Sequence, residues 1–106
     1  MAILDDINRA IRVLRYRVSE HAGEEMKADN LREAQLLTAG FDGEVIEDYP
    51  GAYPCPACLV LVHLAAGDPV HVVWAFERQS GYAVMVTAYR PDPKRWSADF
   101  RKRVKP

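Results

Sequence analysis

Hydrophobic positions in the first forty residues recur every three or four places, which is the spacing of one face of an α-helix. The first such stretch covers residues 3–14, where isoleucines and leucines stand among charged residues. Ser19 is a good N-cap for a second helix, which runs from residue 20 to about residue 28. Asn30, followed three residues later by a glutamate, predicts a capping box and a third helix that Gly40 closes.

The spacing changes near residue 44, where short apolar runs replace the helical pattern. Residues 44–49 alternate in part, which predicts a short strand. Three longer apolar runs follow at residues 58–64, 70–76 and 82–89, with turn-forming segments between them. These runs predict a four-stranded antiparallel sheet with its strands in sequential order.

Prolines and the last aromatic residues define the remaining segments. Residues 50–56 contain three prolines, which lack the N–H that a central strand needs, so a loop is expected there. Trp96, Phe100 and Val104 recur every four residues after the last strand, which predicts a C-terminal helix on or beside the sheet. The expected fold is a single α+β domain over residues 1–106, with N-terminal helices packed on the sheet.

The central strands are apolar at nearly every position, so both faces of the sheet are expected to be covered. The N-terminal helices can cover one face. The C-terminal segment or a second subunit would cover the other, and a homodimer is therefore one way to bury it.

Length and composition narrow the class of protein. A chain of 106 residues with 49% hydrophobic residues suits one domain with its own core. No stretch approaches the roughly 20 apolar residues of a membrane helix. Charged residues occur throughout residues 1–17, unlike a signal peptide. A cytoplasmic location without membrane contact is expected.

The charges are unevenly distributed although the formal net charge is only -1. Residues 19–68 hold ten acidic and two basic residues, whereas residues 94–105 hold six basic residues and one acidic residue. A solvated helical face explains this pattern, and so does a tail that contacts phosphates or an acidic partner. The near-zero total argues against a tight, free-standing nucleic-acid binder.

Histidines within the apolar runs are the first candidates for chemistry. Strand alternation places Tyr89 and Thr87 on one face with Ala83 and Met85. If the register aligns them, His71 lies across from Tyr89 or Thr87, and an imidazole beside a phenol can serve as an acid–base pair. The alternative is a buried histidine that is hydrogen-bonded within the core.

The other two histidines also have two interpretations. His63 stands in another apolar run and is expected to be a core histidine. His21 opens the second helix, whose positive end favours the neutral imidazole of a general base. It can equally be a histidine that only hydrogen-bonds a neighbouring strand.

The Cys55-Pro56-Ala57-Cys58 segment suggests redox chemistry or, together with His63 and His71, a zinc site. An apolar strand follows it, not the helix that stabilises a redox thiolate, and the spacing matches no common zinc module. Cys58 is expected to be a small buried residue and Cys55 a loop residue. No metal and no cofactor are expected.

Several short motifs occur in a distinctive order: SEHA from residue 19, EVIEDYP from 44, CLVL from 58, PVHVV from 69 and VTAYRPDP from 86. In this order the chain resembles the bacterial family called domain of unknown function 4258. The resemblance covers about residues 18–96. The family's layout is similar to that of small toxins of the RelE/BrnT kind, which are ribonucleases.

This resemblance implies a toxin-like, metal-independent endoribonuclease that acts on RNA, free or in the ribosome, and has an antitoxin-like protein partner. The implied catalytic residues are His21, His71 and Tyr89, which should lie within hydrogen-bond reach of one another at an open cleft. The implied RNA contacts are Arg90, Lys94, Arg95, Arg101 and Arg103. The alternative function is a non-enzymatic, homodimeric protein-binding module.

Overall fold

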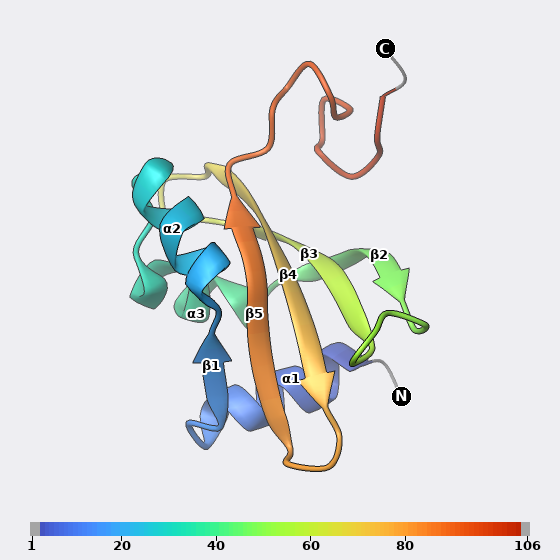
Figure 1. The fold of residues 1–106 in the computed structure, drawn as a ribbon. Helices are drawn as coiled ribbons and strands as arrows, with labels where there is room; N and C mark the ends of the chain where they lie inside the picture. The colour runs from blue at the N-terminus through green and yellow to red at the C-terminus, as the bar shows by residue number, and fades with distance from the viewer. Residues whose placement is uncertain (1–2, 105–106) are drawn as a thin grey trace.

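The computed structural model describes residues 3–104, which form three helices and a five-stranded sheet in the order β1-β5-β4-β3-β2 (Figure 1). The helices are α1 (Ile3–Arg12), α2 (Glu20–Ala28) and α3 (Glu33–Gly40). The strands are β1 (Tyr16–Val18), β2 (Glu44–Tyr49), β3 (Ala57–His63), β4 (Pro69–Glu77) and β5 (Tyr82–Tyr89). The predicted α+β class is confirmed. Within residues 3–104, every helix is too short or too polar to cross a membrane.

The sheet is mixed, whereas the sequence predicted four antiparallel strands. Strands β2 to β5 are antiparallel and sequential, as expected. The difference is β1, which pairs in parallel with β5 at the edge of the sheet. Three residues are too few to show strand alternation, and β1 is a strand because β5 supplies its hydrogen-bonding partner.

Of the two predicted helix caps, one is confirmed and the other is wrong. The Ser19 hydroxyl accepts a hydrogen bond from the Ala22 N–H at 3.0 Å, so the predicted N-cap of α2 is confirmed. The predicted cap at Asn30 is wrong, because Asn30 takes a left-handed conformation (φ 54°) just after α2. The third helix begins later, where the Gln35 side chain accepts from the Arg32 N–H at 3.0 Å.

The helices pack on one face of the sheet and bury Ile7 and Ile11 of α1 in the main core. The opposing sheet residues include Val72, Trp74 and Met85. The first helix ends at Arg12, two residues before the end of the predicted helical stretch at residue 14. Leu14 is 77% exposed and left-handed (φ 61°), so the predicted stretch was two residues too long.

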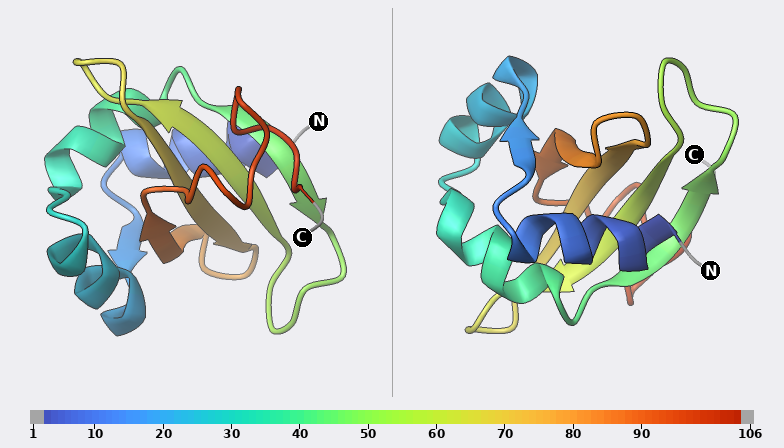
Figure 2. Two further views of the ribbon diagram at one scale, coloured as in Figure 1. Left: turned by 90° about the horizontal axis from the view of Figure 1, so that it is seen from above. Right: turned by 90° about the horizontal axis from the view of Figure 1, so that it is seen from below.

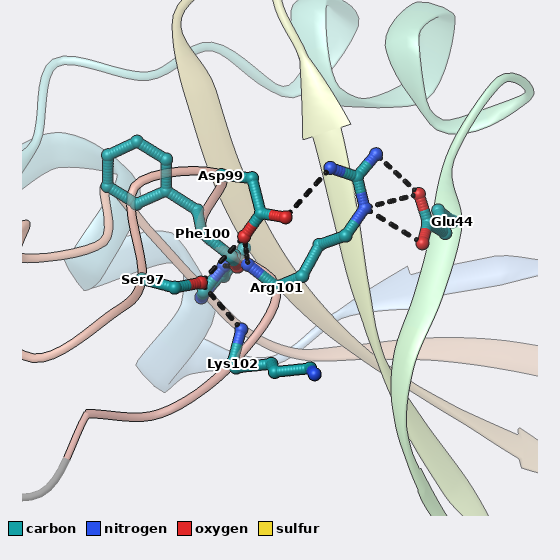
Figure 3. Close-up of polar contacts among 7 residues, drawn as sticks. Glu44, Ser97, Asp99, Phe100, Arg101 and Lys102 are labelled. Carbon is teal, nitrogen blue, oxygen red and sulfur yellow. Dashed lines mark hydrogen bonds and ion pairs between the residues drawn. The ribbon is translucent and has the colours of Figure 1, made fainter.

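The residues after β5 form an irregular hairpin, so the predicted C-terminal helix is wrong. Side chains there bind the backbone groups that a helix would use: Asp99 accepts from the Arg101 N–H, and Ser97 accepts from the Lys102 N–H (Figure 3). Phe100 at the turn is left-handed (φ 61°). Short polar side chains that capture backbone N–H groups favour turns over helix.

This C-terminal hairpin covers part of the second sheet face. Figure 2 shows it on the opposite side of the sheet from α1. The side chains of Leu59, Leu61 and His71 are at most 2% exposed although they stand apart from the helix-side core. The central strands are thus covered on both faces at this end, as their apolar sequence predicted.

Candidate functional site

The centre of the site is a histidine–tyrosine pair across β4 and β5. His71 pairs with Tyr89 in the register, and its Nδ1 lies 3.2 Å from the phenol oxygen. Its Nε2 lies 2.9 Å from the carbonyl oxygen of Phe100 in the hairpin. A carbonyl can only accept, so Nε2 carries the proton, and Nδ1 of the neutral ring accepts from the Tyr89 hydroxyl. The predicted cross-strand contact is confirmed.

A bulge in β5 decides which face Tyr89 occupies. The register shifts so that Val73 pairs with Thr87 while the next residue, Trp74, pairs with Met85. The extra residue reverses the alternation, so Met85 joins the helix-side core while Tyr89 lies on the hairpin side. The prediction that Tyr89 and Thr87 share a face with Ala83 and Met85 is therefore wrong.

The imidazole of this pair is sealed from solvent, whereas Tyr89 is half-buried. His71 is 0% exposed, and its ring meets Trp96 edge to face with centroids 4.3 Å apart. Burial lowers the pKa of His71, while the Phe100 carbonyl and the Glu47 carboxylate act in the opposite direction. The expectation that this histidine opens onto a cleft is wrong, because the hairpin lies directly over it.

An ion pair beside the buried ring anchors the end of the hairpin to β2. Arg103 donates to Glu47 through Nε at 2.8 Å and Nη2 at 3.0 Å. The Tyr49 hydroxyl donates to the same carboxylate. Arg103 also lies over the Trp96 ring, 4.8 Å from its centroid. This arginine holds the pKa of Glu47 below its ordinary value.

The expected RNA-contacting residues are divided between internal pairs and solvent. Arg101 binds Glu44 of β2 with Nη2 at 2.8 Å, in the contact drawn in Figure 3. Arg90, directly after β5, donates to the backbone carbonyl of Asp29 and pairs with the carboxylate of Asp68. Arg95 is 83% exposed, and Lys94 is also exposed. The structure thus leaves Lys94 and Arg95 best placed to meet a ligand.

His21 forms a second, exposed pair on α2. Its side chain is 67% exposed, and Nε2 lies 3.2 Å from Oε1 of Glu25, one helical turn later. Glu25 is fixed in turn by β5, because it accepts from the Thr87 hydroxyl and from the Ala88 N–H. With Nε2 donating to the carboxylate, neutral His21 has Nδ1 as its basic nitrogen.

The structure connects the three predicted catalytic residues only in part. His21 bonds to Glu25, while both ring nitrogens of His71 are occupied by Tyr89 and Phe100, so the expected contact between the histidines is not made. Tyr89 is affected electrostatically by charges of the Arg103–Glu47 pair and of the His21–Glu25 pair. Its pKa is raised overall, chiefly by burial; Glu47 and Glu25 add to the rise, and Arg103 opposes it.

The remaining candidates lie elsewhere. His63 is exposed at the end of β3, so its predicted place in the core is wrong. Cys58 is 0% exposed, and burial raises the pKa of its thiol to about 11, which suits a core residue. Across residues 3–104, no three His, Cys, Asp or Glu side chains gather as ligands for a metal ion, and the alternative zinc set is not assembled.

Sequence reasoning missed the acidic partners of the site. Glu25 carried a usable signal, since it stands four residues after His21 and therefore on the same helical face. The sequence held no such signal for Glu47, because its partner Arg103 lies 56 residues away in the chain. The hydrogen bond from His71 to the Phe100 carbonyl was also missed, because a helix was expected where the C-terminal hairpin lies.

These features define a small α+β domain whose sheet presents a histidine–tyrosine pair beneath a C-terminal hairpin. A family model described as "Domain of unknown function (DUF4258)" matches residues 18–90. The chain belongs to this family. No curated protein and no solved structure matches the chain. The family match leaves α1 and the hairpin outside it, so Lys94 and Arg95 lie beyond the shared region.

Proposed function

We propose that this domain is a toxin-like, metal-independent endoribonuclease in which His21 is the general base. The observation that carries the proposal is an exposed imidazole held by a carboxylate, whose own position β5 fixes. A carboxylate in this position sets the tautomer and orientation of a catalytic histidine. The layout of helices before antiparallel strands is similar to that of RelE/BrnT toxins, which supports the proposal by analogy.

The reaction that this arrangement can perform is transesterification of RNA. Nδ1 of His21 removes the proton of a ribose 2′-hydroxyl, and the resulting oxygen attacks the adjacent phosphorus. The bond from phosphorus to the 5′-oxygen of the next nucleotide breaks, and that oxygen takes a proton from protonated His21 or from water. The products are a 2′,3′-cyclic phosphate and a 5′-hydroxyl end.

Tyr89 and the basic residues have supporting roles in this proposal. Tyr89 is half-buried and contributes its phenol as an acid or a phosphate ligand. His71 is buried behind it and acts as a positioning residue. Exposed Lys94 and Arg95 contact the phosphates, while Arg90, Arg101 and Arg103 contribute when RNA competes with their carboxylate partners.

Ribonuclease assays with the purified protein, with and without ribosomes, test this proposal. His21→Ala should reduce cleavage by about a hundredfold or more, the usual contribution of a general base. Glu25→Gln should also reduce it. His63→Ala is the matched control, because His63 is an exposed histidine outside the site. Equal cleavage by the His21 and His63 variants would remove His21 from the mechanism.

A second candidate function is a non-enzymatic, homodimeric protein-binding module. It is favoured by the part of the sheet face that the hairpin leaves open, where Val86 is 38% exposed. Expression in cells separates the two candidates. Growth arrest that His21→Ala relieves, and that a co-expressed antitoxin-like protein prevents, supports the toxin. No arrest and no cleavage, with a stable dimer, supports the module.

A further inference from the structure

A groove of about 380 Å³ lies on the hairpin side of the sheet, beyond the part that the hairpin covers. Its apolar lining comes from three neighbouring strands and includes Ala57, Val73, Ala75, Val84 and Val86. The loop between β2 and β3 forms one wall. A volume of this size accommodates a large side chain or a small ligand.

The wall of the groove carries the most exposed large hydrophobic side chain of residues 3–104. Tyr53 is 96% exposed, on the loop that Figures 1 and 2 show projecting from the sheet. The same loop contributes Pro54 and Cys55 to the groove. An exposed aromatic ring beside an apolar depression is typical of a protein-interaction surface.

The charges around the groove are self-complementary. Arg17 and Glu77 line it, and Arg17 Nη2 lies 3.3 Å from the Glu77 carboxylate. A surface with one cation and one anion can face a two-fold copy of itself, so that each charge meets its opposite. Arg17 and Glu77 already neutralise each other, so this surface has no net charge that would select a partner of one sign, and two copies can meet without leaving a like charge unpaired.

We propose that this groove is the interface of a symmetric homodimer, in which Tyr53 of each copy enters the groove of the other. A two-fold interface uses the same patch on both copies, so the patch must hold both the inserting group and its receptor. This surface holds both. The proposal gives the second candidate function its interface, and it stands whether or not the domain cleaves RNA.

Sedimentation equilibrium of the full chain tests the dimer. Tyr53→Ser should weaken self-association by about thirtyfold or more, as truncation of a central aromatic residue does. Val86→Lys should weaken it similarly by placing a charge in the groove. Val13→Lys is the matched control, since Val13 is a 62% exposed valine outside the groove. A monomeric wild type, or equal association of the Tyr53 and Val13 variants, overturns the proposal.

Mixing the two defective variants tests reciprocal insertion. A Tyr53→Ser homodimer has no inserting ring, and a Val86→Lys homodimer has no receptive groove. Their heterodimer keeps one intact contact, so the mixture should associate more tightly than either variant alone. No gain on mixing overturns the exchange of Tyr53. RNA cleavage is measured on the same samples, so that a cleaving monomer contradicts only the dimer and a silent dimer contradicts only the nuclease.

Discussion

The imidazole of His71 accepts a hydrogen bond from the hydroxyl of Tyr89 across two antiparallel strands, with Nδ1 3.2 Å from the oxygen. The opposite ring nitrogen donates to the carbonyl of Phe100 at 2.9 Å. A histidine with no exposed surface thus has both nitrogens satisfied, and it joins the sheet to the C-terminal hairpin. Throughout residues 3–104, the fully buried side-chain nitrogen and oxygen atoms all have partners.

Removal of the Tyr89 hydroxyl should destabilise the protein. Tyr89→Phe leaves the buried Nδ1 of His71 without a donor, which costs about 1–3 kcal/mol in the free energy of unfolding. Urea denaturation measures it. Tyr82→Phe, at the other end of the same strand, is the control and should change stability by less than about 0.5 kcal/mol. Equal effects of the two substitutions would contradict the hydrogen bond.

Stability should decrease as the pH falls below the ordinary pKa of histidine. Burial places the pKa of His71 below its ordinary value of 6.5, so the unfolded chain binds the proton first. The free energy of unfolding is therefore full above that value and declines as the pH falls from it toward the folded-state pKa. Arg101 and Arg103 lower the pKa values of Glu44 and Glu47 below 4.5. The stability that these two carboxylates contribute is therefore lost only as the pH falls below that value, outside the range in which His71 titrates.

Urea unfolding between about pH 7.5 and pH 5.5 measures this dependence. His71→Gln should flatten the decline, because the titrating group is gone. His63→Gln is the matched control and should keep the slope of the wild type. A slope that depends on His63 and not on His71 would show that the buried ring is not the titrating group.

Loss of Arg103 should loosen the hairpin without unfolding the domain. Its side chain is 64% exposed, so Arg103→Met should accelerate hydrogen exchange at the Ser97 and Val104 amides by up to roughly fivefold. High salt should have the same direction of effect on the wild type. The control is Arg95→Met, whose side chain reaches Asp92 only at 3.9 Å. Unchanged exchange in the Arg103 variant would mean that other contacts hold the hairpin.

The two cysteines should react at very different rates. Cys58 is fully buried with a thiol pKa of about 11, whereas Cys55 is half-buried at the groove. A disulfide reagent should therefore label one thiol quickly in the native protein and both in urea. Cys55→Ser should abolish the fast reaction. Fast labelling of both thiols in the native protein would contradict the burial of Cys58.

The local pattern of the sequence determined the helices, most of the sheet and the N-cap at Ser19. Helical spacing, strand alternation and caps depend on residues within a few positions of one another. Such signals place α2 and the four sequential strands. They also predicted that His71 and Tyr89 meet, because a sequential antiparallel sheet makes their strands neighbours.

Only the tertiary structure decided the environment of the site. The bulge in β5 turned Tyr89 to the hairpin side, and the hairpin sealed His71 through a carbonyl 29 residues away. Arg103 met Glu47 across 56 residues, and Thr87 met Glu25 across 62. Contacts between such distant residues depend on how the elements pack. No local periodicity records them, so the sequence identified the histidines as candidates but could not tell that His71 is buried while His21 and His63 reach solvent.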